Sequence, residues 1–230
     1  MITDMNNIIE GKKVALIDMD GVIYDSMKYH VRAWMRMMQE AGIECNADDL
    51  YLMEGMTGTA QINVIAKRAT GHGVSDERAR ELYEIKARYF REIGHHDPMP
   101  GAGRMLRALE RHGLRRILVT GSSQYSLLDN INKDYPGAFL PGDRITARDV
   151  HKGKPDPEPY LRGLALAGVA PEEAIVIENA PLGVRAGKAA GVFTVAVTTG
   201  PIPREAFEKE NADLIFPSMP AFADFLESIK

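Results

Sequence analysis

The chain has 230 residues, of which 45% are hydrophobic and 26% charged, the composition of a globular protein with a sizeable core. The formal net charge of −4 argues against a nucleic-acid-binding protein, which would normally be basic. Residues 1–13 lack the apolar segment of a signal peptide, no run reaches membrane-spanning length, and Cys45 has no internal disulfide partner. We therefore expect a cytoplasmic protein with no membrane or nucleic-acid partner, and we treat it as a monomer.

A short buried strand is predicted at residues 14–17, and two carboxylates, Asp18 and Asp20, follow it directly. Residues at i and i+2 leave a strand on the same side, and Gly21 lets the chain turn away. Two like charges this close repel each other unless a cation or a proton lies between them, so such a pair is typical of a catalytic site. An acidic turn or a helix cap is the structural alternative.

The segment of residues 26–97 contains no convincing strand. An apolar stripe at helical spacing predicts a helix that ends near Gly42, and helical patterns follow at residues 50–54, at residues 59–69 and after Ser75. The residues of the first stripe are Val31, Trp34, Met35 and Met38. We interpret the segment as an all-helical cap domain inserted after the first strand.

The cap is expected to move on two connections, at residues 24–27 and 95–100. This gives a catalytic core of residues 1–25 and 98–230 and a cap of residues 26–97. His95 and His96 lie in the second connection, where a solvated linker is expected rather than a metal site, because no third ligand accompanies them.

Beyond the cap, short apolar segments alternate with helical patterns that stop at glycine, which predicts a doubly wound α/β domain with a parallel sheet. The expected strands are residues 116–120, 174–178 and 193–197, with a weaker one at 213–216. The expected helices are residues 103–111, 157–167 and 181–190. The whole chain is thus predicted to be a Rossmann-like core with an inserted helical cap.

Three further motifs follow core strands. Thr120, Gly121 and Ser122 precede a helix and form a candidate anion site, although a plain N-cap has the same pattern. Lys154 lies in a proline-rich loop that would hold its charge in place for a phosphate, although lysines are usually solvated. Glu178 and Asn179 end a strand as an acid and an amide, and both supply oxygens of the kind that Mg²⁺ prefers. In a parallel sheet, positions at the carboxyl ends of strands converge, so these groups are expected to share one site.

In order, Asp18–Asp20, Thr120, Lys154 and Glu178–Asn179 resemble the four motifs of the haloacid dehalogenase superfamily, and the helical insert resembles the cap of its β-phosphoglucomutase-like branch. The resemblance implies a Rossmann-like core, Mg²⁺ and an aspartyl-phosphate intermediate.

The resemblance also implies a role for each residue. Asp18 would attack phosphorus, and Asp20 would act as general acid and base, so it must carry a proton part of the time. A neighbouring carboxylate and a closed cap are expected to favour that proton. Lys154, Thr120 and the backbone after it would hold the phosphoryl group. The metal ligands would be Asp18, Asn179 and Asp20, the last through its backbone carbonyl.

Two departures from the branch pattern refine the functional prediction. Asn179 stands where an Asp is usual, and Glu54 stands in a cap loop where a basic or neutral residue is common. We interpret this as a swap in which Glu54 completes the Mg²⁺ shell when the cap closes, which favours an inorganic pyrophosphatase. The structural alternative for Glu54 is a solvated helix-end acid.

The second phosphate of pyrophosphate would need donors from the cap, and His30, Tyr83 and Lys86 are the candidates. The alternatives are a solvated Lys86, a Tyr83 in the cap core and a His30 on the helix surface. A sugar-phosphate phosphatase or a phosphomutase is the functional alternative. A non-enzymatic phospho-acceptor module is a third interpretation, against which Asp20 and the cap argue.

Overall fold

The computed structural model describes residues 8–94, 97–122 and 125–229, without the side chains of residues 125–129. Six parallel strands form one sheet in the order β3-β2-β1-β4-β5-β6, which confirms the predicted fold class. The strands are β1 (Val14–Ile17), β2 (Arg115–Val119), β3 (Arg144–Ile145), β4 (Ala174–Glu178), β5 (Phe193–Val197) and β6 (Leu214–Phe216). The strand order reverses at β1 and β4, and in such sheets ligands bind beyond the carboxyl ends of the strands at that point.

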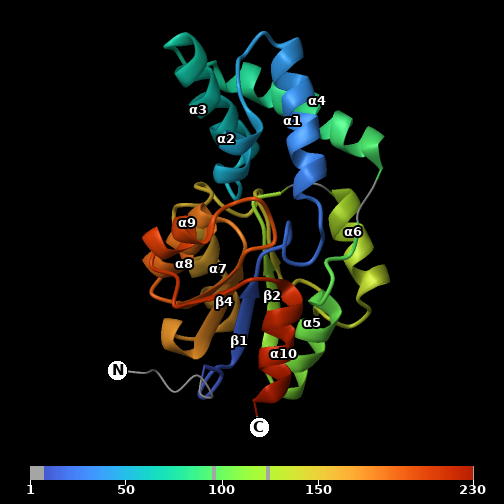
Figure 1. Ribbon diagram of the computed structural model, residues 1–230, viewed down its shortest axis with the longest axis vertical. Helices are drawn as coiled ribbons and strands as arrows, with labels where there is room; N and C mark the ends of the chain where they lie inside the picture. The colour runs from blue at the N-terminus through green and yellow to red at the C-terminus, as the bar shows by residue number, and fades with distance from the viewer. Residues whose placement is uncertain (1–7, 95–96, 123–124, 230) are drawn as a thin grey trace.

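Helices cover both faces of the sheet (Figure 1). The core helices are α5 (Ala102–Arg111), α6 (Tyr125–Asp134), α7 (Glu158–Ala167), α8 (Pro181–Ala189), α9 (Arg204–Lys209) and α10 (Met219–Ser228). Neighbouring residues of β1 show the alternation: Leu16 packs in a cluster with Tyr160 of α7, and Ile17 in one with Phe222 of α10. Both faces of the strand are therefore apolar, as the unbroken hydrophobic run predicted.

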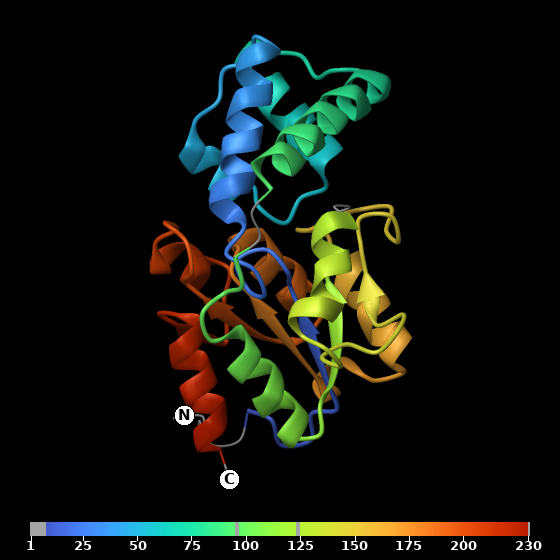
Figure 2. The ribbon, with the colours of Figure 1, turned by 90° about the vertical axis from the view of Figure 1, so that its right-hand side faces the viewer.

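Four helices form a separate layer above the carboxyl ends of the strands (Figures 1 and 2). They are α1 (Met27–Glu40), α2 (Ala47–Leu52), α3 (Gly58–Thr70) and α4 (Asp76–Ile93), and α4 packs against both α1 and α3. This arrangement supports the proposed division into a core and a cap of residues 26–97. Within the described ranges, no helix is long and apolar enough to cross a bilayer.

The apolar stripe of α1 differs from the prediction at one position. Val31, Trp34 and Met38 are buried, but Met35 is 36% exposed. Met35 follows Trp34 by one residue, which is about 100° around a helix, so its side chain leaves the buried stripe. Its neighbour is Cys45, whose Sγ lies 3.7 Å from the sulfur of Met35.

The two chain connections between core and cap lie side by side. The backbone N–H of Asp25 donates to the carbonyl of Asp97 at 2.8 Å, and that of Met99 donates to Ile23 at 2.9 Å. Lys28 bridges them, with its Nζ 2.5 Å from Asp25 and 3.4 Å from Asp97. The crossing from one domain to the other is thus a single narrow region, suited to a hinge. The linker prediction for His95 and His96 falls outside the described residues.

Candidate active site

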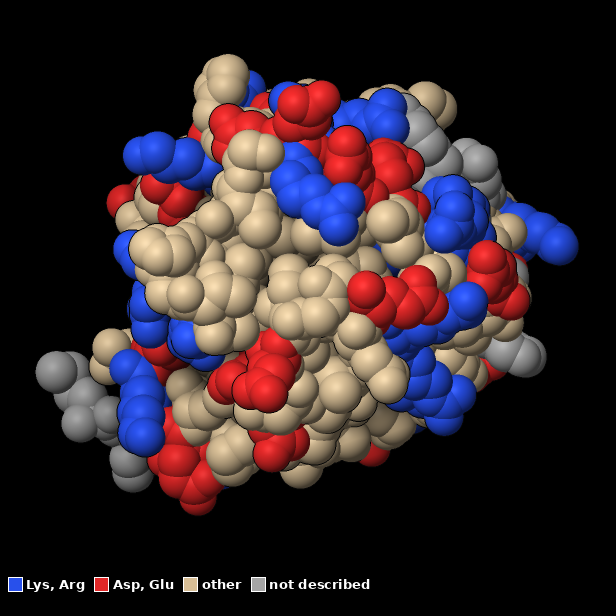
Figure 3. Space-filling view, turned by 90° about the horizontal axis from the view of Figure 1, so that it is seen from above, with Lys and Arg blue, Asp and Glu red and all other residues tan. Residues whose placement is uncertain are grey.

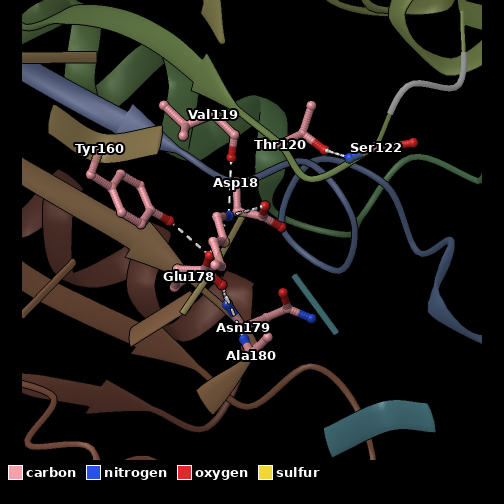
Figure 4. A network of polar contacts seen from close by, with 9 residues as sticks. Asp18, Val119, Thr120, Ser122, Tyr160, Glu178, Asn179 and Ala180 are labelled. Atoms are coloured by element: carbon pink, nitrogen blue, oxygen red, sulfur yellow. Dashed lines mark hydrogen bonds and ion pairs between the residues drawn. The ribbon is translucent and has the colours of Figure 1, made fainter. Parts of the chain in front are cut away.

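A buried ion cluster lies at the reversal point of the sheet (Figure 4). The Nζ of Lys154 is 2.6 Å from Asp18 Oδ1 and 2.5 Å from Glu178 Oε1, and it also donates to the carbonyl of Val119 at 3.1 Å. All three charged side chains are buried. The structure therefore brings Asp18 and Lys154, predicted from distant motifs, into direct contact.

Glu178 serves to hold this cluster in place. Its Oε1 also accepts from the Tyr160 hydroxyl at 2.7 Å, and its Oε2 accepts from the backbone N–H groups of Asn179 at 2.9 Å and Ala180 at 3.1 Å. A carboxylate that accepts three hydrogen bonds in addition to a buried ammonium contact is rigidly oriented. Its sequence position suggested a metal oxygen, but in the structure Glu178 binds Lys154 instead.

The cluster holds more negative than positive charge. Burial raises the pKa of Asp18 to about 8, against the attraction of Lys154, and the nearby carboxylates of Glu178 and Asp20 add to the increase. Burial alone would lower the pKa of Lys154, but Asp18 and Glu178 outweigh it and raise that pKa. Lys154 is therefore charged, and a further cation would let Asp18 ionise fully.

Asp20 faces the cap. Its Oδ1 accepts from the Ser26 hydroxyl at 2.5 Å and contacts His30 Nε2 at 3.0 Å, while Lys86 Nζ lies 2.6 Å from His30 Nδ1. Because an ammonium only donates, Nδ1 must accept from Lys86, so His30 carries its proton on Nε2 and donates it to Asp20. Both His30 and Lys86 are buried, which excludes the solvated alternatives for them.

The pKa of Asp20 is shifted in the direction opposite to the one that the sequence suggested. Burial would raise its pKa, but the contacts with His30 and the hydrogen bond from Ser26 outweigh it, so the pKa lies below the ordinary value. The prediction that neighbours favour the proton was wrong for this state, because the closest groups are donors rather than carboxylates. Asp20 is ionised here and must gain its proton from elsewhere.

Thr120, at the end of β2, accepts a 3.0 Å hydrogen bond from the N–H of Ser122, and both side chains are buried. Gly121 between them lies against the cap, since a Cβ there would be 2.6 Å from the carbonyl oxygen of Gly55. Only glycine allows this approach, so the cap loop closes directly over the predicted phosphate-binding turn.

The residues fit a metal ion. The buried Oδ1 of Asn179 has no hydrogen-bond partner among the described residues, and such an orphaned oxygen is suited to a cation. The amide of Asn179 occupies the space that a Cβ on Gly21 would fill, 1.8 Å from it, beside the Asp18–Asp20 turn. Among the described residues, no group of three or more His, Cys, Asp or Glu side chains is arranged so that it could hold a metal ion. A set of Asp18, Asn179 and the Asp20 backbone carbonyl is therefore more consistent with the geometry than three carboxylates.

One cavity lies between the two domains. From the core it is lined by Asp18, Asp20 and residues 120–122. From the cap it is lined by all four predicted residues, His30, Glu54, Tyr83 and Lys86, together with Trp34 and Gln61, which the sequence did not single out. Lys154 and Asn179 do not line the cavity. Lys154 contacts Asp18, and Asn179 packs against Gly21 in the turn after it.

Glu54 is half-buried in this cavity rather than solvated, which excludes its structural alternative. Burial raises its pKa to about 8, and the carboxylate of Asp20 adds to the increase while Lys86 opposes it. Burial likewise lowers the pKa of Lys86 to about 8, against the attraction of Glu54 and Asp20. A carboxyl group in these surroundings binds a proton or a cation near neutral pH.

The loop that carries Lys154 is fastened at Glu158, which accepts the N–H groups of Lys152 at 2.8 Å and His151 at 3.1 Å. These bonds lower the pKa of Glu158 to about 2. Because the folded pKa lies below the unfolded one, the contribution to stability is full above about pH 4.5 and is lost between there and pH 2.

We therefore expect Glu158→Gln to lower the melting temperature by a few degrees at pH 7, with a difference that shrinks steadily below pH 4.5. Calorimetric scans across pH measure it, with the exposed Glu44→Gln as the control. A difference that is constant across pH would show that the Glu158 charge does not hold the loop.

The cap end of the molecule shows acidic and basic side chains intermixed around an uncharged area (Figure 3). This face does not carry a continuous surface of one sign. The charges that matter for a ligand are those inside the cavity.

The structure thus combines a parallel α/β core with a buried aspartate–lysine pair under a helical cap. The chain belongs to the haloacid dehalogenase-like hydrolase family, whose sequence model matches residues 12–191.

Individual relatives place it in the β-phosphoglucomutase-like branch of that family. Hexitol phosphatase A of Escherichia coli (strain K12) is 29% identical over 204 residues, which cover 89% of this chain and 90% of the relative. Validoxylamine A 7′-phosphate phosphatase of Streptomyces hygroscopicus subsp. limoneus is 31% identical over 188 residues, covering 81% and 86%. A solved structure from Bacteroides vulgatus, provisionally described as a β-phosphoglucomutase, has 40% identity and a TM-score of 0.91, with 98% of this chain and 97% of that chain covered.

Proposed function

We propose that this protein is a Mg²⁺-dependent phosphohydrolase that acts on a small phosphorylated sugar or polyol. The observation that carries the proposal is the Asp18 carboxylate held 2.6 Å from Lys154 at the end of β1, in the cavity between core and cap. The substrate class is supported by relatives whose names describe phosphatases of phosphorylated carbohydrates and polyols. The comparisons favour this alternative over the pyrophosphatase that the sequence suggested.

In this mechanism Asp18 attacks phosphorus and the bond to the leaving oxygen breaks, which forms an aspartyl phosphate. Lys154 orients Asp18 and offsets the negative charge of the phosphoryl oxygens, which Thr120 and the turn after it help to hold. Asp18, Asn179 and the Asp20 backbone would hold Mg²⁺, which when bound supplies further positive charge against the same oxygens.

Asp20 acts as the general acid in the first step and as the general base in the second. It gives a proton to the leaving oxygen, then removes one from the water that cleaves the aspartyl phosphate, which releases phosphate and restores Asp18. The negative charge of the substrate would raise the pKa of Asp20 above its low value in the free protein. Asp20 could then carry a proton when the leaving oxygen needs one. His30, linked to Lys86, keeps the Asp20 carboxylate oriented toward the cavity.

Turnover on a panel of phosphate esters tests the proposal. With Mg²⁺, we expect hexitol and hexose phosphates to be hydrolysed faster than pyrophosphate, and EDTA to abolish all of these activities. Isomerisation of β-glucose 1-phosphate would instead indicate a phosphomutase. An absence of turnover on every organic phosphate, with pure folded protein and Mg²⁺, would refute the sugar-phosphate proposal.

One observation keeps pyrophosphate as a second candidate. Glu54 adds a carboxyl group to the cavity from the cap, where it faces Asp20 and Asp18. If this group completes the Mg²⁺ shell, the cavity favours a small substrate close to the metal.

For this second candidate we expect Glu54→Gln to weaken Mg²⁺ binding, because the substitution keeps the size but removes the charge. Pyrophosphate hydrolysis should fall roughly 10- to 100-fold, the scale for groups that support a metal. Calorimetry of Mg²⁺ binding measures the first effect independently of turnover, and adding Asn179→Asp should restore part of the affinity.

The exposed cap residue Glu84 provides the control as Glu84→Gln. If Glu54→Gln bound Mg²⁺ as tightly as the wild type, Glu54 would have no metal role. The sugar-phosphate proposal would then be the remaining candidate.

A further inference from the structure

The buried side-chain nitrogen of Gln61 has no hydrogen-bond partner in the described part of the chain. Its side chain is 3% exposed, and its Nε2 atom is one of two buried side-chain polar atoms without a partner among the described residues. The other is Asn179 Oδ1, at the site suited to a metal. A buried donor without a protein partner destabilises the fold unless a water, an ion or a ligand group pairs with it.

Gln61 lies in the cap wall of the cavity that contains Asp18 and Asp20. It is three residues after Gly58 in α3, and so on the same helix face. Gly58 carries no side chain where a Cβ would lie 2.1 Å from the ring of Tyr83, so that ring packs directly on the helix. The ring of Trp34 lies 6.3 Å from that of Tyr83.

The cavity therefore has two chemically different regions. The core side, with Asp18, Thr120 and the nearby Lys154, matches the transferring phosphoryl group. The cap side combines the rings of Trp34 and Tyr83 with the amide donor of Gln61, and Lys86 Nζ lies 4.8 Å from the centroid of the Trp34 ring. Flat apolar rings accommodate the CH faces of a sugar or polyol, and an amide N–H requires an oxygen acceptor.

We propose that Gln61 is a specificity-determining residue whose Nε2 donates a hydrogen bond to a hydroxyl oxygen of the leaving group. The inference rests on the proposed function and adds that the leaving group is a polyol or sugar that contacts the cap.

The decisive experiment compares leaving groups in the variant Gln61→Met, which keeps the length of the side chain and removes the donor. We expect kcat/KM for a hexitol phosphate to fall about 10-fold or more, the factor that corresponds to one net hydrogen bond. For phenyl phosphate, whose leaving group lacks that hydroxyl, the fall should be much smaller. The melting temperature of the free protein should not decrease, because the variant no longer buries an unpaired donor. Gln39→Met, on the exposed face of α1, is the matched control.

Three results would overturn the inference. An equal loss on both esters would show that Gln61 acts only through the structure of the cap. A loss confined to pyrophosphate would assign the acceptor oxygen to a second phosphoryl group. An unchanged kcat/KM for the hexitol phosphate would show that Gln61 donates no hydrogen bond to this substrate. By contrast, a wild-type protein that hydrolyses no organic phosphate would refute the proposed function, and this inference with it.

Discussion

Asp18→Asn is expected to abolish turnover while the protein stays folded. The amide keeps the shape of the side chain and an oxygen that can accept from Lys154 Nζ, which lies 2.6 Å from Asp18 in the wild-type chain. It cannot attack phosphorus as a carboxylate does. Loss of a nucleophile that has no substitute reduces kcat by roughly 10⁴-fold or more. Steady-state hydrolysis with Mg²⁺ measures the effect, and intact-protein mass spectrometry should detect no phosphoryl adduct.

Stability separates this result from unfolding. Burial raises the pKa of Asp18 to about 8, so its charge is unfavourable in the absence of a further cation. A neutral amide should therefore leave the melting temperature unchanged or increase it. Turnover close to that of the wild type in Asp18→Asn would assign the nucleophile to another residue.

The catalytic centre on the core was predictable because local patterns determine it. A buried apolar run followed by Asp18 and Asp20 requires a strand that ends at a polar edge, and alternation with helices requires parallel strands. The carboxyl ends of such strands meet at one edge, so Thr120, Lys154 and Asn179 could be assigned to the same site without coordinates. The structure places Lys154 in contact with Asp18 and Asn179 against Gly21, and neither side chain lines the cavity.

Contacts between the two domains were less accessible from sequence. The chain Lys86–His30–Asp20 depends on how α1 and α4 lie over the sheet, and no periodicity encodes that orientation. The low pKa of Asp20 follows from these contacts, which is why the sequence suggested the opposite direction. Gln61 was missed for the same reason, since its only signal is the absence of a partner.

Two failures have simpler causes. β3 has only two residues, Arg144 and Ile145, and is too short for any pattern to reveal. Glu178 was interpreted from its motif as a candidate metal oxygen, but its partner Tyr160 comes from a helix 18 positions earlier. A carboxylate whose acceptor sites are already used by Lys154, Tyr160 and the backbone has little capacity left for a metal ion.

Lys154 links catalysis to stability, because it is the only ammonium among the described residues that contacts both Asp18 and Glu178. Removing one partner of a buried ion pair leaves uncompensated charge and costs about 3–5 kcal/mol. For a chain of this length, about 1 kcal/mol corresponds to a shift of roughly 2–4 °C in melting temperature. We therefore expect Lys154→Met to melt roughly 10 °C lower than the wild type at pH 7 and to lose activity by roughly 10³-fold, since the group that orients Asp18 is gone.

The stability that Lys154→Met loses relative to the wild type should depend on pH in one direction. Without the ammonium, the pKa of Asp18 rises further above its unfolded value, so the folded variant binds this proton more tightly than its unfolded chain does. The deficit relative to the wild type should therefore narrow as the pH falls toward 5. Lys152→Met, an exposed substitution in the same loop, is the control and should change neither property.

A second substitution distinguishes the two roles of Lys154. Glu178→Gln in the Lys154→Met background removes one of the stranded charges and keeps acceptor and donor atoms for Tyr160 and the backbone. It should recover a large part of the lost melting temperature, while activity stays low because Asp18 still lacks its cation. The four proteins form a double-mutant cycle in which a coupling of the two sites is expected in stability. If activity and stability recovered together, Lys154 would act through the fold alone and would have no direct part in phosphoryl transfer.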